Sequence, residues 1–164
     1  MGATAQYAIL QALYWSTFCT MFNYASPYLA DKGLSSSLIG LVLGSSYALS
    51  ALVQALFPAL VARLKLQLTR VMGLIFTLIA LLAVALFFRG ESFLIYLLPI
   101  LIFTLHSAMQ PSVNALQLSI QAEGKGPDFG LARGIGSASY ALVSVLLGQL
   151  FGTLSIAWLP IFYL

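Results

Sequence analysis

Charged side chains divide this chain into long apolar segments. No charged residue occurs in residues 1–30, 33–62, 71–88, 92–122 or 134–164. A helix needs roughly 20 apolar residues to cross the hydrocarbon core of a bilayer, which is about 30 Å thick. The pattern therefore predicts membrane-spanning helices over residues 6–30, 36–62, 70–88, 93–121 and 129–151.

The last charge-free segment is too long for one helix. Polar and glycine residues interrupt it between Gly152 and Ser155, and a second apolar run follows. Nine or ten residues cover about 15 Å, which is half of the hydrocarbon core. We therefore expect an incomplete sixth span over residues 155–164 and a chain that is a fragment, with a short re-entrant segment as the alternative.

Polar side chains recur at helical spacing in the predicted fourth helix. They follow steps of four, four, three and four residues, which places them on one face: His106, Gln110, Asn114, Gln117 and Gln121. Polar groups in hydrocarbon are costly unless they face a partner or water. We expect this stripe to line a watery pathway. For His106, a neutral packing role and a proton relay are equally open.

Two other predicted helices also carry polar side chains at helical spacing. The stripes are Arg133, Ser137, Tyr140 and Ser144 in the fifth helix, and Ser16, Thr20 and Asn23 in the first. We expect the three stripes to converge on a shared polar interior, although such side chains also join helices to one another. A central arginine costs about 2.5 to 3.5 kcal/mol to insert. Arg133 therefore either contacts a ligand or extends to the cytoplasmic interface near Phe129.

Composition narrows the class of protein. Hydrophobic residues make up 61% of the chain, with seven basic and four acidic side chains, which excludes a soluble globular domain, a disordered chain and a nucleic-acid binder. The single cysteine, Cys19, excludes an internal disulfide or a thiolate metal site. The zinc-protease and serine-nucleophile motifs are absent from the sequence and the carboxylates lie in loops, so we expect no enzyme, cofactor or metal.

Basic residues predict the orientation. Arg63, Lys65 and Arg70 cluster between the second and third predicted helices, which places that loop and the amino terminus in the cytoplasm of a plasma membrane, most simply a bacterial inner membrane. Glycines four residues apart favour close helix crossings: Gly40 and Gly44, Gly130 and Gly134, and Gly148 and Gly152. Residues 46–49 match residues 139–142, 93 positions later, as in a three-plus-three inverted repeat.

Two segments carry a family resemblance. They are Pro111-Ser-Val-Asn114 and Asp128-Phe-Gly-Leu-Ala-Arg133-Gly-Ile-Gly136-Ser137. The chain resembles the amino-terminal half of a major facilitator superfamily transporter, closest to the galactoside and oligosaccharide proton symporters of the lactose permease type. The resemblance implies an all-α membrane fold of six helices, with the sixth truncated. It also implies that Arg133 hydrogen-bonds sugar hydroxyls, that Tyr140 replaces a tryptophan stacked on the sugar, and that Ser137 lies beside it.

The sequence departs from that family at two places. Asn114 stands where the family has a sugar-binding glutamate, which removes a charged partner of Arg133. In the loop after the second helix, Pro58 and Ala62 replace a glycine and an aspartate of the family's cytoplasmic gating motif. The resemblance therefore does not establish galactoside specificity, and that gating latch is not carried over.

The expected function is secondary active transport by alternating access, as proton-coupled symport of a sugar, oligosaccharide or nucleoside. The expected binding residues are Arg133, Tyr140, Ser137, Asn114, Gln110, His106 and Asn23. The expected partners are a small neutral hydroxylated solute, protons, membrane lipid and a missing carboxy-terminal six-helix half, with no nucleic acid. The alternative is a half-size membrane protein that self-associates as a homodimer without transport chemistry of its own.

Overall fold

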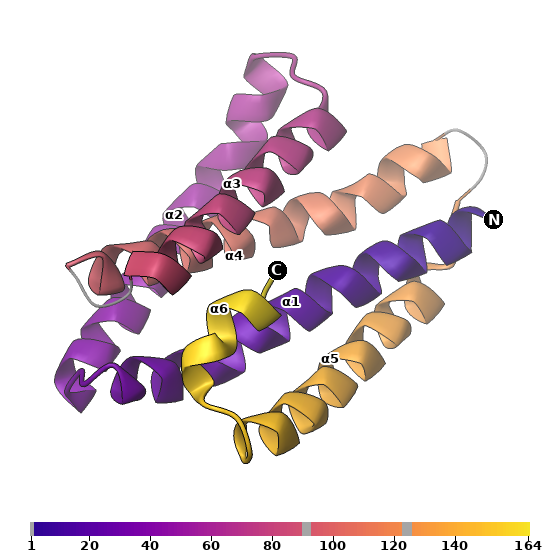
Figure 1. Ribbon diagram of the computed structural model, residues 1–164. Coiled ribbons are helices and arrows are strands. Elements are labelled where there is room, and N and C mark those ends of the chain that lie inside the picture. The colour runs from indigo at the N-terminus through magenta and orange to yellow at the C-terminus, as the bar shows by residue number, and fades with distance from the viewer. Residues whose placement is uncertain (1, 90–92, 123–125) are drawn as a thin grey trace.

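The described part of the chain forms five long helices and a short helical end. The computed structural model describes residues 2–89, 93–122 and 126–164. In order these are α1 (Ala3–Asp31), α2 (Ser36–Arg63), α3 (Leu68–Arg89), α4 (Leu94–Ala122), α5 (Phe129–Phe151), the 3₁₀ turn η1 (Ile156–Trp158) and α6 (Leu159–Phe162) (Figure 1). The ends of the long helices lie within three residues of the predicted ranges. Over residues 155–164 the chain forms two short turns of different type.

Side-chain caps account for two of the helix starts. The Ser35 hydroxyl accepts a hydrogen bond from the Leu38 amide, and the Asp128 carboxylate accepts one from the Leu131 amide at 2.9 Å. The backbone amide of Asp128 itself donates to the hydroxyl of Thr4. The beginning of α5 is therefore tied directly to the beginning of α1.

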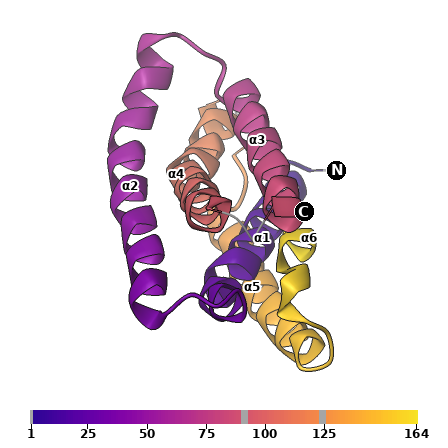
Figure 2. The same ribbon diagram turned by 60° about the vertical axis from the view of Figure 1, so that its left-hand side comes forward.

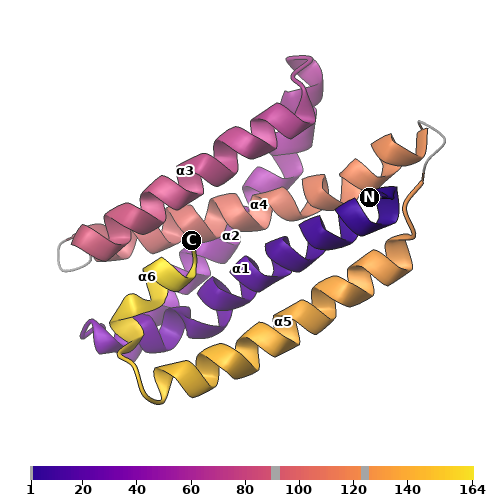
Figure 3. The same cartoon turned by 45° about the vertical axis from the view of Figure 1, so that its right-hand side comes forward.

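The helices pack in pairs around α1 and α4. Helix α1 packs along α5, α2 and α3 pack on α4, and α1 meets α4 between the pairs. Helix α3 lies beside α6 at the edge of the bundle (Figure 2). Figure 3 shows the beginnings of α1, α3 and α5 at one end of the bundle and the beginning of α4 at the other. Helix direction therefore alternates along the chain, as in a protein that crosses a membrane repeatedly.

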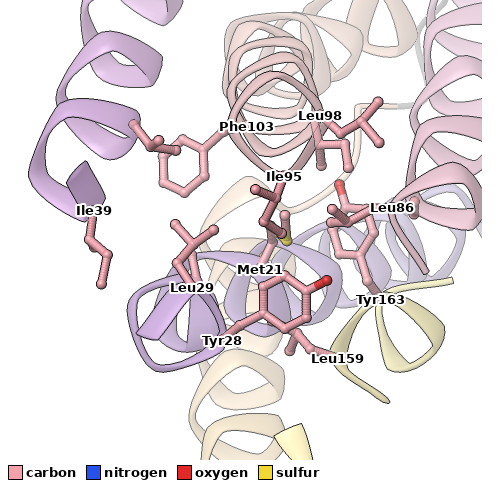
Figure 4. Packing of buried hydrophobic residues seen from close by; sticks show 14 of the residues in the cluster. Met21, Tyr28, Leu29, Ile39, Leu86, Ile95, Leu98, Phe103, Leu159 and Tyr163 are labelled. Atoms are coloured by element: carbon pink, nitrogen blue, oxygen red, sulfur yellow. The ribbon is translucent and has the colours of Figure 1, made fainter. Parts of the chain in front are cut away.

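One apolar core joins most of the helices. Met21 and Leu29 of α1 meet Phe103 of α4, Leu86 of α3 and Leu159 of α6 in a buried cluster (Figure 4). These side chains are all 1% exposed or less. The short α6 is held against the bundle by van der Waals packing in this cluster, because lipid tails are as apolar as these side chains and add no hydrophobic driving force.

Four described helices are long and apolar enough to cross a membrane: Ser36–Arg63, Leu68–Phe88, Leu94–Leu118 and Phe129–Phe151. Helix α1 is 29 residues long but carries more polar side chains. Its Gln11 and Thr20 are buried, at 0% and 2% exposure, against the rest of the bundle. A helix enclosed by others can carry polar groups that a lipid-facing helix cannot. Helix α1 is not among the four candidate spans, so the membrane span predicted over residues 6–30 stays a prediction.

The closest glycine contact between α1 and α5 is at Gly136, which belongs to none of the expected glycine pairs. A Cβ atom on Gly40, Gly44 or Gly134 would meet no atom within 4 Å, whereas one on Gly136 would lie 2.7 Å from Trp15 Cδ1. Gly148, which belonged to an expected pair, would place its Cβ 3.2 Å from the Tyr24 hydroxyl. Spacing alone misplaced the contact because a four-residue glycine pair does not specify which face meets a neighbour.

Candidate functional site

The Arg133 side chain packs against α1 and does not extend to the start of its own helix, α5. Its guanidinium carbon is 4.0 Å from the centre of the Trp15 ring, within the range of a cation–π contact. Its Nη1 donates a hydrogen bond of 2.8 Å to the Ser137 hydroxyl, one turn further along α5. The cation is thus held between an indole face and a hydroxyl, neither of which carries a negative charge.

A second polar contact joins the same two helices further along. The Tyr140 hydroxyl donates to Oδ1 of Asn23, and the Asn23 amide nitrogen donates to the Ser144 hydroxyl at 3.0 Å. The Tyr24 hydroxyl donates to the Ser144 carbonyl at 2.6 Å. Both polar atoms of the Asn23 amide are therefore occupied, which fixes the orientation of Tyr140 relative to α1.

Gln11 connects this site to α4. Its side-chain nitrogen donates to the Tyr7 hydroxyl at 2.7 Å and to Oδ1 of Asn114 at 3.3 Å, while its oxygen accepts from the Trp15 indole at 2.9 Å. The Tyr7 hydroxyl in turn donates to the Val113 carbonyl of α4. Gln11 is fully buried, so these bonds set the position of Trp15. Among the described contacts, Asn114 is connected to Arg133 through Gln11 and Trp15.

A cavity of about 230 Å³ opens beside these residues. It is lined by Trp15, Arg133, Ser137 and Tyr140. The guanidinium has five N–H donors and gives one of them to Ser137, so the cavity is bounded by hydrogen-bond donors and by two aromatic rings. Such a lining suits a small solute that has both hydroxyl groups and an apolar ring face.

His106 lies in a separate aromatic cluster. Its ring is 4.8 Å from Tyr14 and 5.4 Å from Phe18, and its Nδ1 hydrogen-bonds the Tyr163 hydroxyl. It is 1% exposed, and its Nε2 is buried with no hydrogen-bond partner among the described residues. Phe18 also packs against Trp15, at 5.2 Å. His106 is therefore separated from the cavity beside Arg133 by one aromatic ring.

The remaining residues of the α4 stripe take different positions. Gln110 is half-buried, and no described contact joins it to Arg133 or Tyr140. Gln117 is also half-buried and has its own interaction, while the side chain of Gln121 lies outside the described residues. The three predicted stripes thus converge in part: α1 and α5 meet directly, and α4 joins them through Asn114.

Comparison with known proteins places the chain in a family. The family model described as the MFS_1 like family matches residues 5–164, which is nearly the whole chain. The chain belongs to the MFS_1-like family. It is therefore a multi-pass membrane protein of the major facilitator superfamily, whose members are transporters. No curated protein and no solved structure matches the chain.

Sequence reasoning missed three residues of this MFS_1-like chain that shape the site: Tyr7, Gln11 and Trp15. With Cys19 and Asn23 they follow steps of four along the face of α1 that meets α5. The expected first-helix stripe instead began with Ser16 and Thr20, and the Thr20 hydroxyl donates to the carbonyl of Ser16 within the helix. The four-residue spacing from Tyr7 was the available signal, but aromatic residues do not distinguish a polar face from an apolar one.

Proposed function

We propose that this chain forms one half of a secondary active transporter for a small neutral hydroxylated solute: a sugar, an oligosaccharide or a nucleoside. The solute binds in the cavity beside Trp15 and Arg133. Ser137 and Tyr140 line the same cavity. Asn23 positions Tyr140, and Asn114 positions Trp15 through Gln11.

The direction of the Arg133 side chain is the observation that carries this proposal. Helical side chains lean toward the start of their helix, and an arginine extending to the interface would do so toward Phe129. The Arg133 guanidinium instead bonds Ser137, four residues later in α5. It therefore extends toward the middle of the helix, where a charged group needs water or a ligand.

The lining residues supply complementary chemistry for a hydroxylated ring. The free guanidinium N–H groups donate to solute oxygens, and the Ser137 oxygen is close enough to the guanidinium to share the same solute group. Trp15 and Tyr140 have ring centres 6.4 Å apart and are inclined at 62°, which presents two apolar surfaces to a sugar or a base.

The helix pairing supports a three-plus-three repeat and alternating access. If α1, α2 and α3 are exchanged with α4, α5 and α6, the α1–α5 pair becomes the α4–α2 pair, and the α3–α4 pair becomes the α6–α1 pair. All of these pairs are in contact. The matching residues 46–49 and 139–142 lie on α2 and α5, which exchange with each other. Repeats of this kind rock against a second half around a fixed site.

Proton coupling is part of the proposal and follows from the family resemblance. His106 is the titratable side chain on α4 that lies nearest to this site through Phe18 and Trp15. Collapse of solute accumulation by a protonophore is the expected result. Accumulation that is unaffected by the protonophore would contradict proton coupling but not the proposed binding site.

Tryptophan fluorescence tests solute binding directly. The chain has two tryptophans, so Trp158→Phe leaves Trp15 as the sole indole, at the edge of the cavity. Titration with a panel of sugars and nucleosides should change the Trp15 emission in a saturable way, and Arg133→Gln should need a much higher solute concentration for the same change. Equal saturable binding by Arg133→Gln would contradict the assignment of the site.

A further inference from the structure

A second cavity lies where α2 ends, α3 begins and α4 passes between them. Its volume is about 250 Å³, and its lining is apolar except for Ser112; the lining includes Pro58, Val61, Ala62, Leu68 and Pro111. It shares no lining residue with the cavity beside Arg133. Pro58 and Ala62, two positions at which the sequence departs from the family that it resembles, both line this recess.

Three cations lie immediately beside this recess. Arg63 ends α2 directly after Ala62, Lys65 lies in the connection, and Arg70 lies in the first turn of α3. All three side chains are exposed. Residues 32–90 contain no carboxylate in the sequence, so these cations have no acidic neighbour along α2 or α3. The recess is thus apolar inside and positively charged at its rim.

Lys65 has a backbone conformation that ordinarily favours glycine. Its φ is 52°, and the pair of bonds from Lys65 N to Ala62 O and from Leu66 N to Val61 O closes the end of α2. The end of α1 is closed by the same two bonds, from Gly33 and Leu34, with glycine at φ 82° in the equivalent place. A lysine there costs conformational energy that a glycine would not, which favours a role for its charge.

We propose that this recess binds one anionic phospholipid, with an acyl chain in the cavity and the phosphate facing Arg63, Lys65 and Arg70. Charge complementarity selects this occupant, because a zwitterionic lipid would fill the recess equally well but would gain less from three cations that have no carboxylate within residues 32–90. Basic clusters next to membrane helices attract anionic lipids in this way. The recess and its three cations take no part in the proposed solute site.

Native mass spectrometry of the full chain tests the headgroup assignment. The probe is an equimolar mixture of phosphatidylglycerol and phosphatidylcholine with identical acyl chains. The chain should retain phosphatidylglycerol preferentially, and Arg63→Gln, Lys65→Gln and Arg70→Gln should each reduce the preference, by about fivefold for each cation. The control Lys32→Gln removes a half-buried cation at the end of α1, away from the recess, and should change nothing.

Equal retention of the two lipids by the unmodified chain would overturn the proposal. So would a preference that survives when all three cations are replaced, or one that Lys32→Gln lowers to the same degree. The substitutions of the three cations lie at exposed positions, and circular dichroism of each variant establishes that it is folded.

A second pair of variants tests whether the lipid occupies the cavity. Ala62→Phe fills the recess, whereas Ala59→Phe adds the same side chain to an exposed position on α2 that does not line it. Ala62→Phe should retain at least fivefold less phosphatidylglycerol than Ala59→Phe. Equal retention by the two variants would show that the cations attract lipid without a bound acyl chain and would reject the site.

Discussion

The Arg133 guanidinium lies 4.0 Å from the centre of the Trp15 ring, and the glycine that permits this approach is one turn away on the same helix. A Cβ on Gly136 would lie 2.7 Å from Trp15 Cδ1 and 3.2 Å from the Gln11 carbonyl oxygen. Helices α1 and α5 are therefore in close contact at the depth of the cavity. The indole is fixed by α5 on one side and by its bond to Gln11 on the other.

Replacement of Arg133 should weaken solute binding more than any other single change in the cavity. Hydrogen bonds to charged groups contribute about 1.5 to 3 kcal/mol, so we expect Arg133→Gln to lower affinity roughly 10- to 150-fold. Arg133→Lys should restore little of this, because an ammonium lacks the planar fork that both stacks on an indole and donates in parallel. Titration of Trp15 fluorescence measures both variants. Full affinity in Arg133→Lys would show that charge alone suffices.

Gly136→Ala should disturb the site although alanine favours helices. The added methyl group requires Trp15 to move, so solute affinity should fall and Trp15 emission should shift. Gly134→Ala is the matched control, since nothing lies within 4 Å of its Cβ, and it should leave binding unchanged and stabilise α5 by up to about 1 kcal/mol. Identical behaviour of the two variants would contradict the close α1–α5 contact.

Tyr140 and Asn23 should be energetically coupled. Tyr140→Phe removes the hydroxyl that donates to Asn23 while leaving the ring in the cavity. In a double-mutant cycle with Asn23→Ala, the coupling in the free energy of unfolding should be about 0.5 to 1.5 kcal/mol. Tyr140→Phe combined with Thr77→Val, on α3, should be additive. Additivity in both pairs would mean that the Tyr140–Asn23 bond does not form.

Substitutions at the equivalent positions Gly33, after α1, and Lys65, after α2, should change the free energy of unfolding in opposite directions. Lys65→Gly removes the cost of a side chain at φ 52° and should raise the free energy of unfolding by about 1 kcal/mol. Gly33→Ala creates the same cost at φ 82° and should lower it by a similar amount. Thermal unfolding in one detergent measures both. A destabilised Lys65→Gly variant would show that the lysine stabilises the fold through another contact.

The sequence predicted the helices better than the site, for a physical reason. Charge-free segments report directly on where a chain can remain helical in an apolar environment, and the five ranges follow from them. The Arg133–Ser137 contact could also be predicted from the sequence, because the two residues are four apart on one helix. The roles of Gln11 and Trp15 could not be predicted, because they depend on which face of α1 meets α5.

His106 illustrates the same limit. Its spacing placed it with Gln110 and Asn114, but its nearest partners are Tyr14 of α1 and Tyr163, just after α6. Whether a histidine packs among aromatic rings or faces water depends on helices far away in sequence. A stripe on one helix specifies which residues share a face, and the neighbouring helices decide what that face contacts.

Water accessibility of Ser137 tests the central claim most directly. Cys19→Ser removes the native cysteine, and Ser137→Cys then places a single thiol in the cavity. The account predicts that a membrane-impermeant thiol reagent labels it, that a bound solute protects it, and that Thr77→Cys on α3 is neither labelled nor protected. Absence of labelling at position 137, or labelling equal to that at position 77, would contradict a solute site between α1 and α5.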